Sequence, residues 1–92
     1  MNETDAKTIT AKICEIIDER TDYSADDLAG RTSELLHTDL GIDSLTLLDV
    51  ALSIDQEYET DFPEEELLGM ETIEKATTMV VDKLKENKES AE

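Results

Sequence analysis

Apolar residues in this chain recur at the spacing of an amphipathic α-helix and nowhere alternate as they do in a half-buried β-strand. The first series predicts a helix over residues 5–20 with Thr4 or Asp5 as its cap, and its members are Ile9, Ile13, Ile16 and Ile17. The chain also holds only three glycines and one proline, which favours helices over a turn-rich β architecture. We therefore expect an all-α fold.

Three further helices are expected along the chain. Residues 44–59 form the second helix, and residues 62–69 form a short third one, with a proline near its start and a glycine at its end. The last helix covers residues 73–86 and is capped by Thr72. Its inward-facing stripe consists of Ile73, Ala76, Val80 and Leu84.

The sequence thus predicts a single domain over residues 1–92, a small four-helix bundle of three longer helices plus one short helix. Residues 21–42 form a long first loop, whose isolated apolar residues would pin it across the helix ends. Order is expected over about residues 5–86, and the tail at 87–92 is expected to fray. We expect the domain to be a monomer.

The net charge of −17 argues against two classes of partner. Nucleic acids and anionic membrane surfaces would both be repelled by so acidic a chain. The acids are also concentrated in the interval from Thr32 to Glu74, which contains no Lys or Arg and these thirteen acids: Glu34, Asp39, Asp43, Asp49, Asp55, Glu57, Glu59, Asp61, Glu64, Glu65, Glu66, Glu71 and Glu74. This interval is either a solvated, self-repelling surface or a field that steers basic partners toward the protein.

Compartment is indicated by what the chain lacks. No stretch reaches the ~20 apolar residues of a membrane span, and the N-terminus lacks the basic and apolar regions of a secretory signal. The single Cys14 has no partner for an internal disulfide and is expected to be a small buried hydrophobe. We therefore expect a cytoplasmic protein with no membrane span.

The predicted helix 44–59 carries apolar residues on two opposite sides. At about 100° per residue, the side that faces the core consists of Leu47, Val50, Ala51, Ile54 and Tyr58. Leu45, Leu48 and Leu52 fall on the other side, with Asp49 among them and Asp55 at the edge. A bundle of this size cannot easily bury both sides. The three leucines are therefore either a binding strip or a surface that the last helix or the loop covers.

Ser44 opens this helix, where free backbone N–H groups and the helix dipole favour an anion such as phosphate. It is a poor hydrolase nucleophile, because residues 42–46 lack the Gly-x-Ser-x-Gly pattern and no histidine stands beside it in the sequence. His37, the only histidine, is expected to be a solvated loop residue. No metal site is expected, because no glycine of the chain stands in register with an EF-hand loop.

The segment Asp39-Leu40-Gly41-Ile42-Asp43-Ser44-Leu45 resembles the attachment motif of acyl carrier proteins. The resemblance extends through residues 55–58 and the Phe62-Pro63 turn to Thr72-Ile73, and it covers roughly residues 8–84. It implies that Ser44 carries 4'-phosphopantetheine, transferred from coenzyme A by a phosphopantetheinyl transferase. The thiol of that arm would hold an acyl group as a thioester, and the protein itself would not be an enzyme.

The same resemblance implies that the second helix is the partner surface. The partner-binding residues would be Asp43, Leu45, Leu48, Asp49, Leu52 and Asp55. Besides the transferase, the implied partners are acyl-transferring or condensing enzymes with basic docking patches.

Two positions depart from the housekeeping fatty-acid carriers of the family. Thr46 stands where an acid is common, and Gln56 stands where a glutamate is common. The pathway therefore stays open between general fatty-acid synthesis, a polyketide-type system and a specialised acyl transfer. The alternative function is an acidic helical adaptor whose Ser44 is unmodified.

Overall fold

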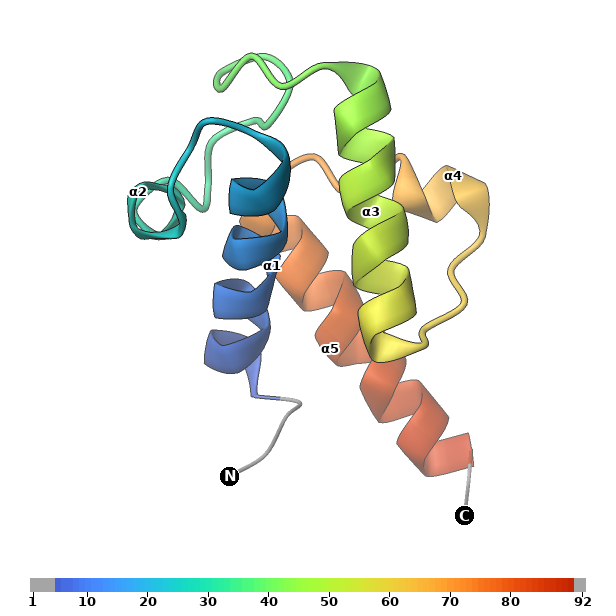
Figure 1. Ribbon diagram of the computed structural model, residues 1–92. Helices are drawn as coiled ribbons and strands as arrows, with labels where there is room; N and C mark the ends of the chain where they lie inside the picture. The colour runs from blue at the N-terminus through green and yellow to red at the C-terminus, as the bar shows by residue number, and fades with distance from the viewer. Residues whose placement is uncertain (1–4, 91–92) are drawn as a thin grey trace.

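The computed structural model describes the backbone of residues 5–90 and the side chains of residues 5–86. Within this part of the chain every regular element is a helix, in the order α1 (Ala6–Arg20), α2 (Ala25–Ala29), α3 (Ser44–Tyr58), α4 (Glu64–Leu67) and α5 (Ile73–Ser90). Three longer helices and the short α4 confirm the predicted all-α bundle. Figure 1 shows α1 and α3 side by side, α5 crossing behind them, and α4 on the outer side of α3.

The core lies where α1 contacts α3 and α5. The apolar residues whose helical spacing predicted the helices point into this core. Those that are fully buried include Ile9, Ile13, Ile17, Ile54, Ile73 and Val80. Leu84, at the end of the predicted stripe of α5, is half-buried and packs against this core. Burial of such side chains is worth about 1.5–3 kcal/mol each, so the amphipathic pattern supplies most of the driving force for this arrangement.

The long connection before α3 contains a helix that the sequence analysis missed. Ser24 begins α2 by accepting a hydrogen bond from the backbone N–H of Asp27 at 3.2 Å, and the first turn is acidic, as suits a helix N-terminus. Leu28 projects from α2 into the core and is fully buried. A helix of five residues is too short to show a helical repeat of apolar residues. Its only signals in the sequence are therefore the capping serine and the acids of the first turn.

The rest of the connection is fastened to the bundle by a few specific bonds. The Tyr23 hydroxyl donates to the Leu40 carbonyl at 2.7 Å, and the Leu36 N–H donates to the Glu71 carbonyl at 2.9 Å. Leu36 and Leu40 are buried, as expected for residues that pin the loop. These contacts hold the loop across the end of the bundle where α3 begins, which Figure 1 shows at the top.

Helix boundaries agree with the sequence in part. Asp5 occupies the cap position of α1 but makes no side-chain cap bond, and Thr4 lies outside the described residues. Thr72 does cap α5, because its hydroxyl accepts from the Lys75 N–H at 2.9 Å. Helix α5 runs on to Ser90, past the predicted end at residue 86, since no glycine or proline interrupts residues 87–90. The last two residues of the expected frayed tail lie outside the described part.

Candidate functional site

Ser44 is the first residue of α3, and its side chain is exposed. The residue before it, Asp43, caps the helix: its carboxylate accepts from the Thr46 N–H at 2.8 Å. That bond from the Thr46 backbone, followed by one from the Thr46 side chain, holds the pKa of the Asp43 carboxyl below its ordinary value. A smaller contribution comes from the charge of His37. Asp43, expected to be a partner residue, therefore has a structural task as well.

A turn at Gly41 directs Ser44 outward. Gly41 has φ +71°, in the left-handed region that favours glycine, and its N–H donates to the His37 carbonyl at 3.1 Å. The next residue, Ile42, is buried and donates its N–H to the Leu36 carbonyl at 3.0 Å. With Ile42 anchored inside, the chain reaches the head of α3 with Ser44 facing solvent.

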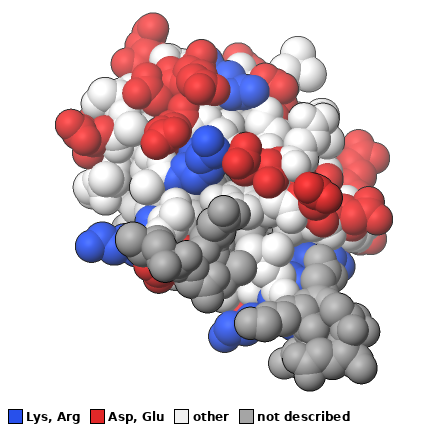
Figure 2. All heavy atoms as spheres, turned by 60° about the horizontal axis from the view of Figure 1, so that its bottom comes forward, with Lys and Arg blue, Asp and Glu red and all other residues white. Residues whose placement is uncertain are grey.

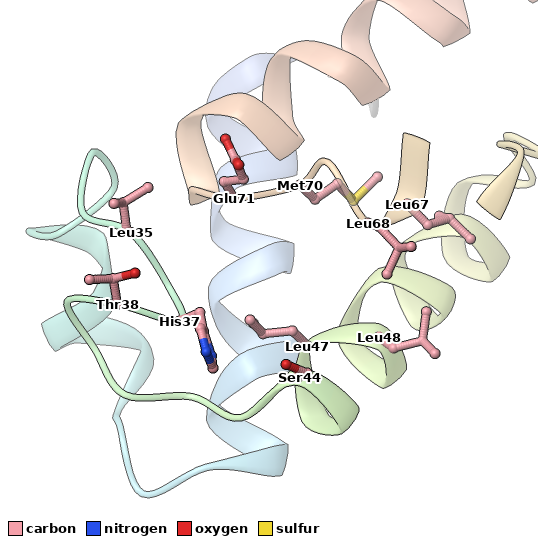
Figure 3. A pocket seen from close by; sticks show the side chains of 10 residues that line it. All are labelled: Leu35, His37, Thr38, Ser44, Leu47, Leu48, Leu67, Leu68, Met70 and Glu71. Atoms are coloured by element: carbon pink, nitrogen blue, oxygen red, sulfur yellow. The ribbon is translucent and has the colours of Figure 1, made fainter. Parts of the chain in front are cut away.

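A pocket of about 330 Å³ opens beside Ser44, between the loop before α3, the first turns of α3 and the segment around α4. Figure 3 shows its lining: Leu35, His37, Thr38, Ser44, Leu47, Leu48, Leu67, Leu68, Met70 and Glu71. Most of these side chains are apolar, and the polar ones are His37, Thr38, Ser44 and Glu71. The site can therefore accept a ligand with an apolar portion that is attached at, or reaches past, the Ser44 hydroxyl.

The two predicted faces of α3 are confirmed by burial. Val50, Ala51 and Ile54 are buried, and Leu47 and Tyr58 are half-buried against the core, whereas Leu45 is 81% exposed and Leu52 is 43% exposed. Leu48 is half-buried, so it is partly exposed as expected, and it contributes to the pocket wall. That this outer face binds a partner stays a prediction.

Two leucines are exposed against expectation: Leu35 was expected to pin the loop as Leu36 and Leu40 do, and Leu68 was not singled out from the sequence. Leu68, just after α4, is 63% exposed, and Leu35, in the loop before α3, is also exposed. Both line the pocket beside Ser44. Neither belongs to a periodic stripe, so only the folded chain places them around one opening together with α3.

The acids predicted to bind partners are already bonded within the chain. Asp49 accepts from Arg20 Nε at 2.9 Å. Asp55 accepts from the Thr60 hydroxyl at 2.6 Å and from the Phe62 N–H at 2.9 Å, so it organises the turn after α3. The negative charges remain near the surface, and each of these two carboxylates already has a hydrogen-bond partner within the chain.

His37 occupies a place that the sequence analysis did not foresee. It is exposed, as expected of a loop residue, but its Nδ1 lies 2.7 Å from the Ile42 carbonyl oxygen and its ring lines the pocket of Ser44. The sequence lacks a histidine next to Ser44, yet the turn at Gly41 brings one to the same opening. No motif in the sequence marks this proximity.

Charge is unevenly spread over the surface. Figure 2 shows acidic side chains along the upper and right-hand margins of one face, with scattered basic ones between them. Among the described residues, no group of three or more His, Cys, Asp or Glu side chains could hold a metal ion. Within the same part of the chain, no helix is both long and apolar enough to cross a membrane. Cys14 is buried, and burial raises the pKa of its thiol.

Comparison with known proteins points to one family. The family model described as phosphopantetheine attachment site matches residues 11–80. The chain is 33% identical over 84 residues to the meromycolate extension acyl carrier protein of Mycobacterium leprae (strain TN), covering 91% of this chain and 71% of that protein. The protein of that name from Mycobacterium bovis (strain ATCC BAA-935 / AF2122/97) is 31% identical over 84 residues, with coverages of 91% and 71%. The one from Mycolicibacterium aurum is 30% identical over 83 residues, with coverages of 90% and 84%. No solved structure matches the chain significantly.

Proposed function

Because this chain belongs to the acyl carrier protein family, whose prosthetic group is covalently attached 4'-phosphopantetheine, we propose that Ser44 is the residue that carries the group. The single observation that supports this assignment most is the position of Ser44. Its hydroxyl is exposed at the first residue of a 15-residue helix and lies on the rim of the largely apolar pocket.

The residues around Ser44 fit a phosphodiester-linked arm. The start of a long helix favours the phosphate through the positive end of the helix dipole, although the Asp43 carboxylate already accepts the Thr46 N–H of the first turn. The pocket next to it offers about 330 Å³ to the arm or to the acyl group at its end. Its leucines and Met70 suit an apolar chain, whereas His37, Thr38 and Glu71 can meet the polar parts of the arm.

Loading the arm needs an outside enzyme. The Ser44 oxygen would form a bond to the phosphorus of the pantetheine phosphate of coenzyme A, while the diphosphate bond to the nucleotide breaks and the serine proton is released. The nucleotide leaves as the bisphosphate that coenzyme A contains. Once attached, the group supplies a terminal thiol that holds acyl chains as thioesters. This chain then presents the thioester to other enzymes and does no chemistry of its own.

The substrate class is best supported as long acyl chains of lipid synthesis. The relatives are named meromycolate extension acyl carrier proteins. The apolar wall of the pocket agrees with a hydrocarbon cargo. We therefore favour acyl-chain extension over a polyketide-type role, although Thr46 and Gln56 depart from the housekeeping carriers.

The partners we propose are a phosphopantetheinyl transferase and acyl-transferring or condensing enzymes with basic docking patches. They would approach the outer face of α3, where exposed leucines lie beside acids. The leucines would be buried on docking, and the net charge of −17 would speed the encounter with a basic surface.

A loading experiment tests the assignment of Ser44. The wild-type protein, incubated with coenzyme A and a broad-specificity transferase, should gain the mass of one phosphopantetheine group, and Ser44→Ala should not. Ser33→Ala removes another exposed serine hydroxyl, outside α3, and serves as the matched control that should load normally. Loading of the Ser44→Ala variant would overturn the assignment. A wild-type protein that never loads would support the unmodified adaptor instead.

A further inference from the structure

His37 and Ser44 meet at the pocket although they belong to different elements. His37 comes from the loop that precedes the Gly41 turn, and Ser44 is the first residue of α3. Both side chains line the pocket, and Figure 3 shows the imidazole reaching down toward the head of the helix. A group attached to the Ser44 oxygen would therefore share one opening with the imidazole.

The ring is held in a defined orientation. Its Nδ1 lies 2.7 Å from the carbonyl oxygen of Ile42, and a carbonyl oxygen only accepts, so Nδ1 is the nitrogen that carries the hydrogen. The other nitrogen, Nε2, is then the one that gains or loses a proton. Because the bond to Ile42 is made in both charge states, protonation changes what Nε2 can do without releasing the ring.

The negative charges around the imidazole would stabilise its protonated, cationic form. Asp43 lies beside it, and Glu71 lines the same pocket from the segment before α5. Asp39 lies on the same loop, and its carboxylate accepts a hydrogen bond from the Leu35 N–H at 2.9 Å. A phosphodiester on Ser44 would add a further negative charge to this group of acids.

Two permanent cations outside the interval of residues 32–74 already have acidic partners, and the partner of Lys75 is Glu71, which lines the pocket. Arg31 pairs with Asp27 and Glu34, and Lys75 pairs with Glu71 at 3.8 Å. No Lys or Arg lies between Thr32 and Glu74, so His37 is the one residue of that interval that can become positive. Among the residues that line the pocket, His37 is therefore the one that can carry a positive charge toward the phosphate.

We propose that His37 is a positioning residue for the phosphate that joins the arm to Ser44, with Nε2–H of the protonated ring donating to a phosphate oxygen at the mouth of the pocket. The proposal rests on the proposed function, because it needs the arm on Ser44. Histidine changes its charge between about pH 5 and 8. The phosphate is thus held at the ring when the imidazole is protonated and is released from it when the imidazole is neutral. The start of the arm becomes freer as the pH rises.

Phosphorus NMR of the loaded protein tests this inference without any activity assay. A phosphodiester keeps a single negative charge across the neutral range, so its own signal has no reason to titrate there. In the loaded wild-type protein we expect the signal to shift between pH 5 and 8. In loaded His37→Gln the shift should be lost, because the Gln amide can still donate to the Ile42 carbonyl but cannot become charged.

A second measurement needs no variant. His37 is the only histidine, so its ring proton signals are unambiguous in the apo and the loaded protein. The midpoint of their titration should move to higher pH on loading, because a negative charge placed beside the ring favours its protonated form. Equal midpoints before and after loading would overturn the inference.

The inference and the proposed function fail in different ways. If Ser44→Ala fails to load, Ser44 is kept as the attachment residue. If the phosphorus signal of the loaded wild-type protein then does not change with pH, the role of His37 is rejected. Persistence of the phosphorus titration in His37→Gln would likewise reject His37. A wild-type protein that gains no mass would instead reject the arm itself.

Discussion

Arg20 and Asp49 join the end of α1 to the outer face of α3 through an ion pair in which Arg20 Nε donates to Asp49 Oδ2 at 2.9 Å. The same guanidinium donates to the Ser53 hydroxyl at 2.7 Å and to the Ile16 carbonyl at 3.1 Å. One cation thus sits beside the face that we expect partners to use. A basic partner that approaches Asp49 must share this carboxylate with Arg20.

The first prediction concerns this sharing. Arg20→Gln should speed association with the transferase at low salt, because it leaves the Asp49 charge uncompensated, and the gain should shrink as salt rises. Asp49→Asn should slow association. In the double variant the gain from Arg20→Gln should be largely lost, which stopped-flow binding can measure. Equal gains in both backgrounds would mean that Arg20 does not act through Asp49.

The second prediction concerns Asp55, which we expect to be more important for stability than for docking. Its carboxylate accepts from Thr60, which is 1% exposed, and from the Phe62 N–H. Hydrogen bonds to charged groups contribute about 1.5–3 kcal/mol, so Asp55→Ala should lower the free energy of unfolding by about that amount in a denaturant titration. Asp61→Asn is the control, since Asp61 is exposed in the same turn and Asn tolerates its φ of +57°. Similar losses in both variants would contradict the role given to Asp55.

The third prediction separates the two faces of α3. Leu45 is 81% exposed and should act by burial in a partner, so Leu45→Ala should weaken loading by the transferase about tenfold or more, largely independent of salt. The matched variant on the core side is Ile54→Ala, where the side chain is 1% exposed. It should cost about 2–5 kcal/mol of stability while loading stays near normal in the folded fraction. If Leu45→Ala unfolded the protein as readily as Ile54→Ala, the outer face would be part of the core.

The fourth prediction concerns pH. The pKa of Asp43 is lowered by the bonds from Thr46, so ionised Asp43 stabilises the folded state above its ordinary range, and this contribution disappears as the pH falls through the lowered folded value. Asp43→Ala should therefore melt below wild type at neutral pH, and the gap should close under strongly acidic conditions. Asp82→Ala, which removes an exposed acid from α5, controls for the loss of one charge. If the difference in melting temperature between Asp43→Ala and wild type grew as the pH fell, the stabilising role given to ionised Asp43 would be contradicted.

The fifth prediction concerns the whole acidic surface. With a net charge of −17, repulsion between acids should lower stability at low ionic strength, and added salt should raise the melting temperature. Magnesium chloride should act in the same way, following ionic strength, because the described residues hold no cluster suited to a metal ion. Specific binding would be indicated instead if magnesium raised the melting temperature to a plateau at concentrations where sodium chloride of equal ionic strength left it unchanged.

Local patterns in the sequence determined much of the fold. Three long helices, the core stripe of α1 and the exposed face of α3 follow from the helical period, because each depends on residues only three or four positions apart. The attachment motif around Ser44 is also local, and it was enough to indicate the family. The exposure of Leu45 and Leu52 followed from the same reasoning, since a small bundle cannot bury both sides of one helix.

Only the tertiary structure decided how distant side chains share their partners. Arg20 reaches Asp49 from another helix, and the turn after α3 takes up the carboxylate of Asp55. The Gly41 turn brings His37 to the pocket of Ser44, and Leu68 joins the same pocket from beyond α4. Such contacts depend on how helices cross and where loops lie in three dimensions. A periodic pattern fixes which side of a helix is apolar, but it does not specify which residue of another element will lie against it.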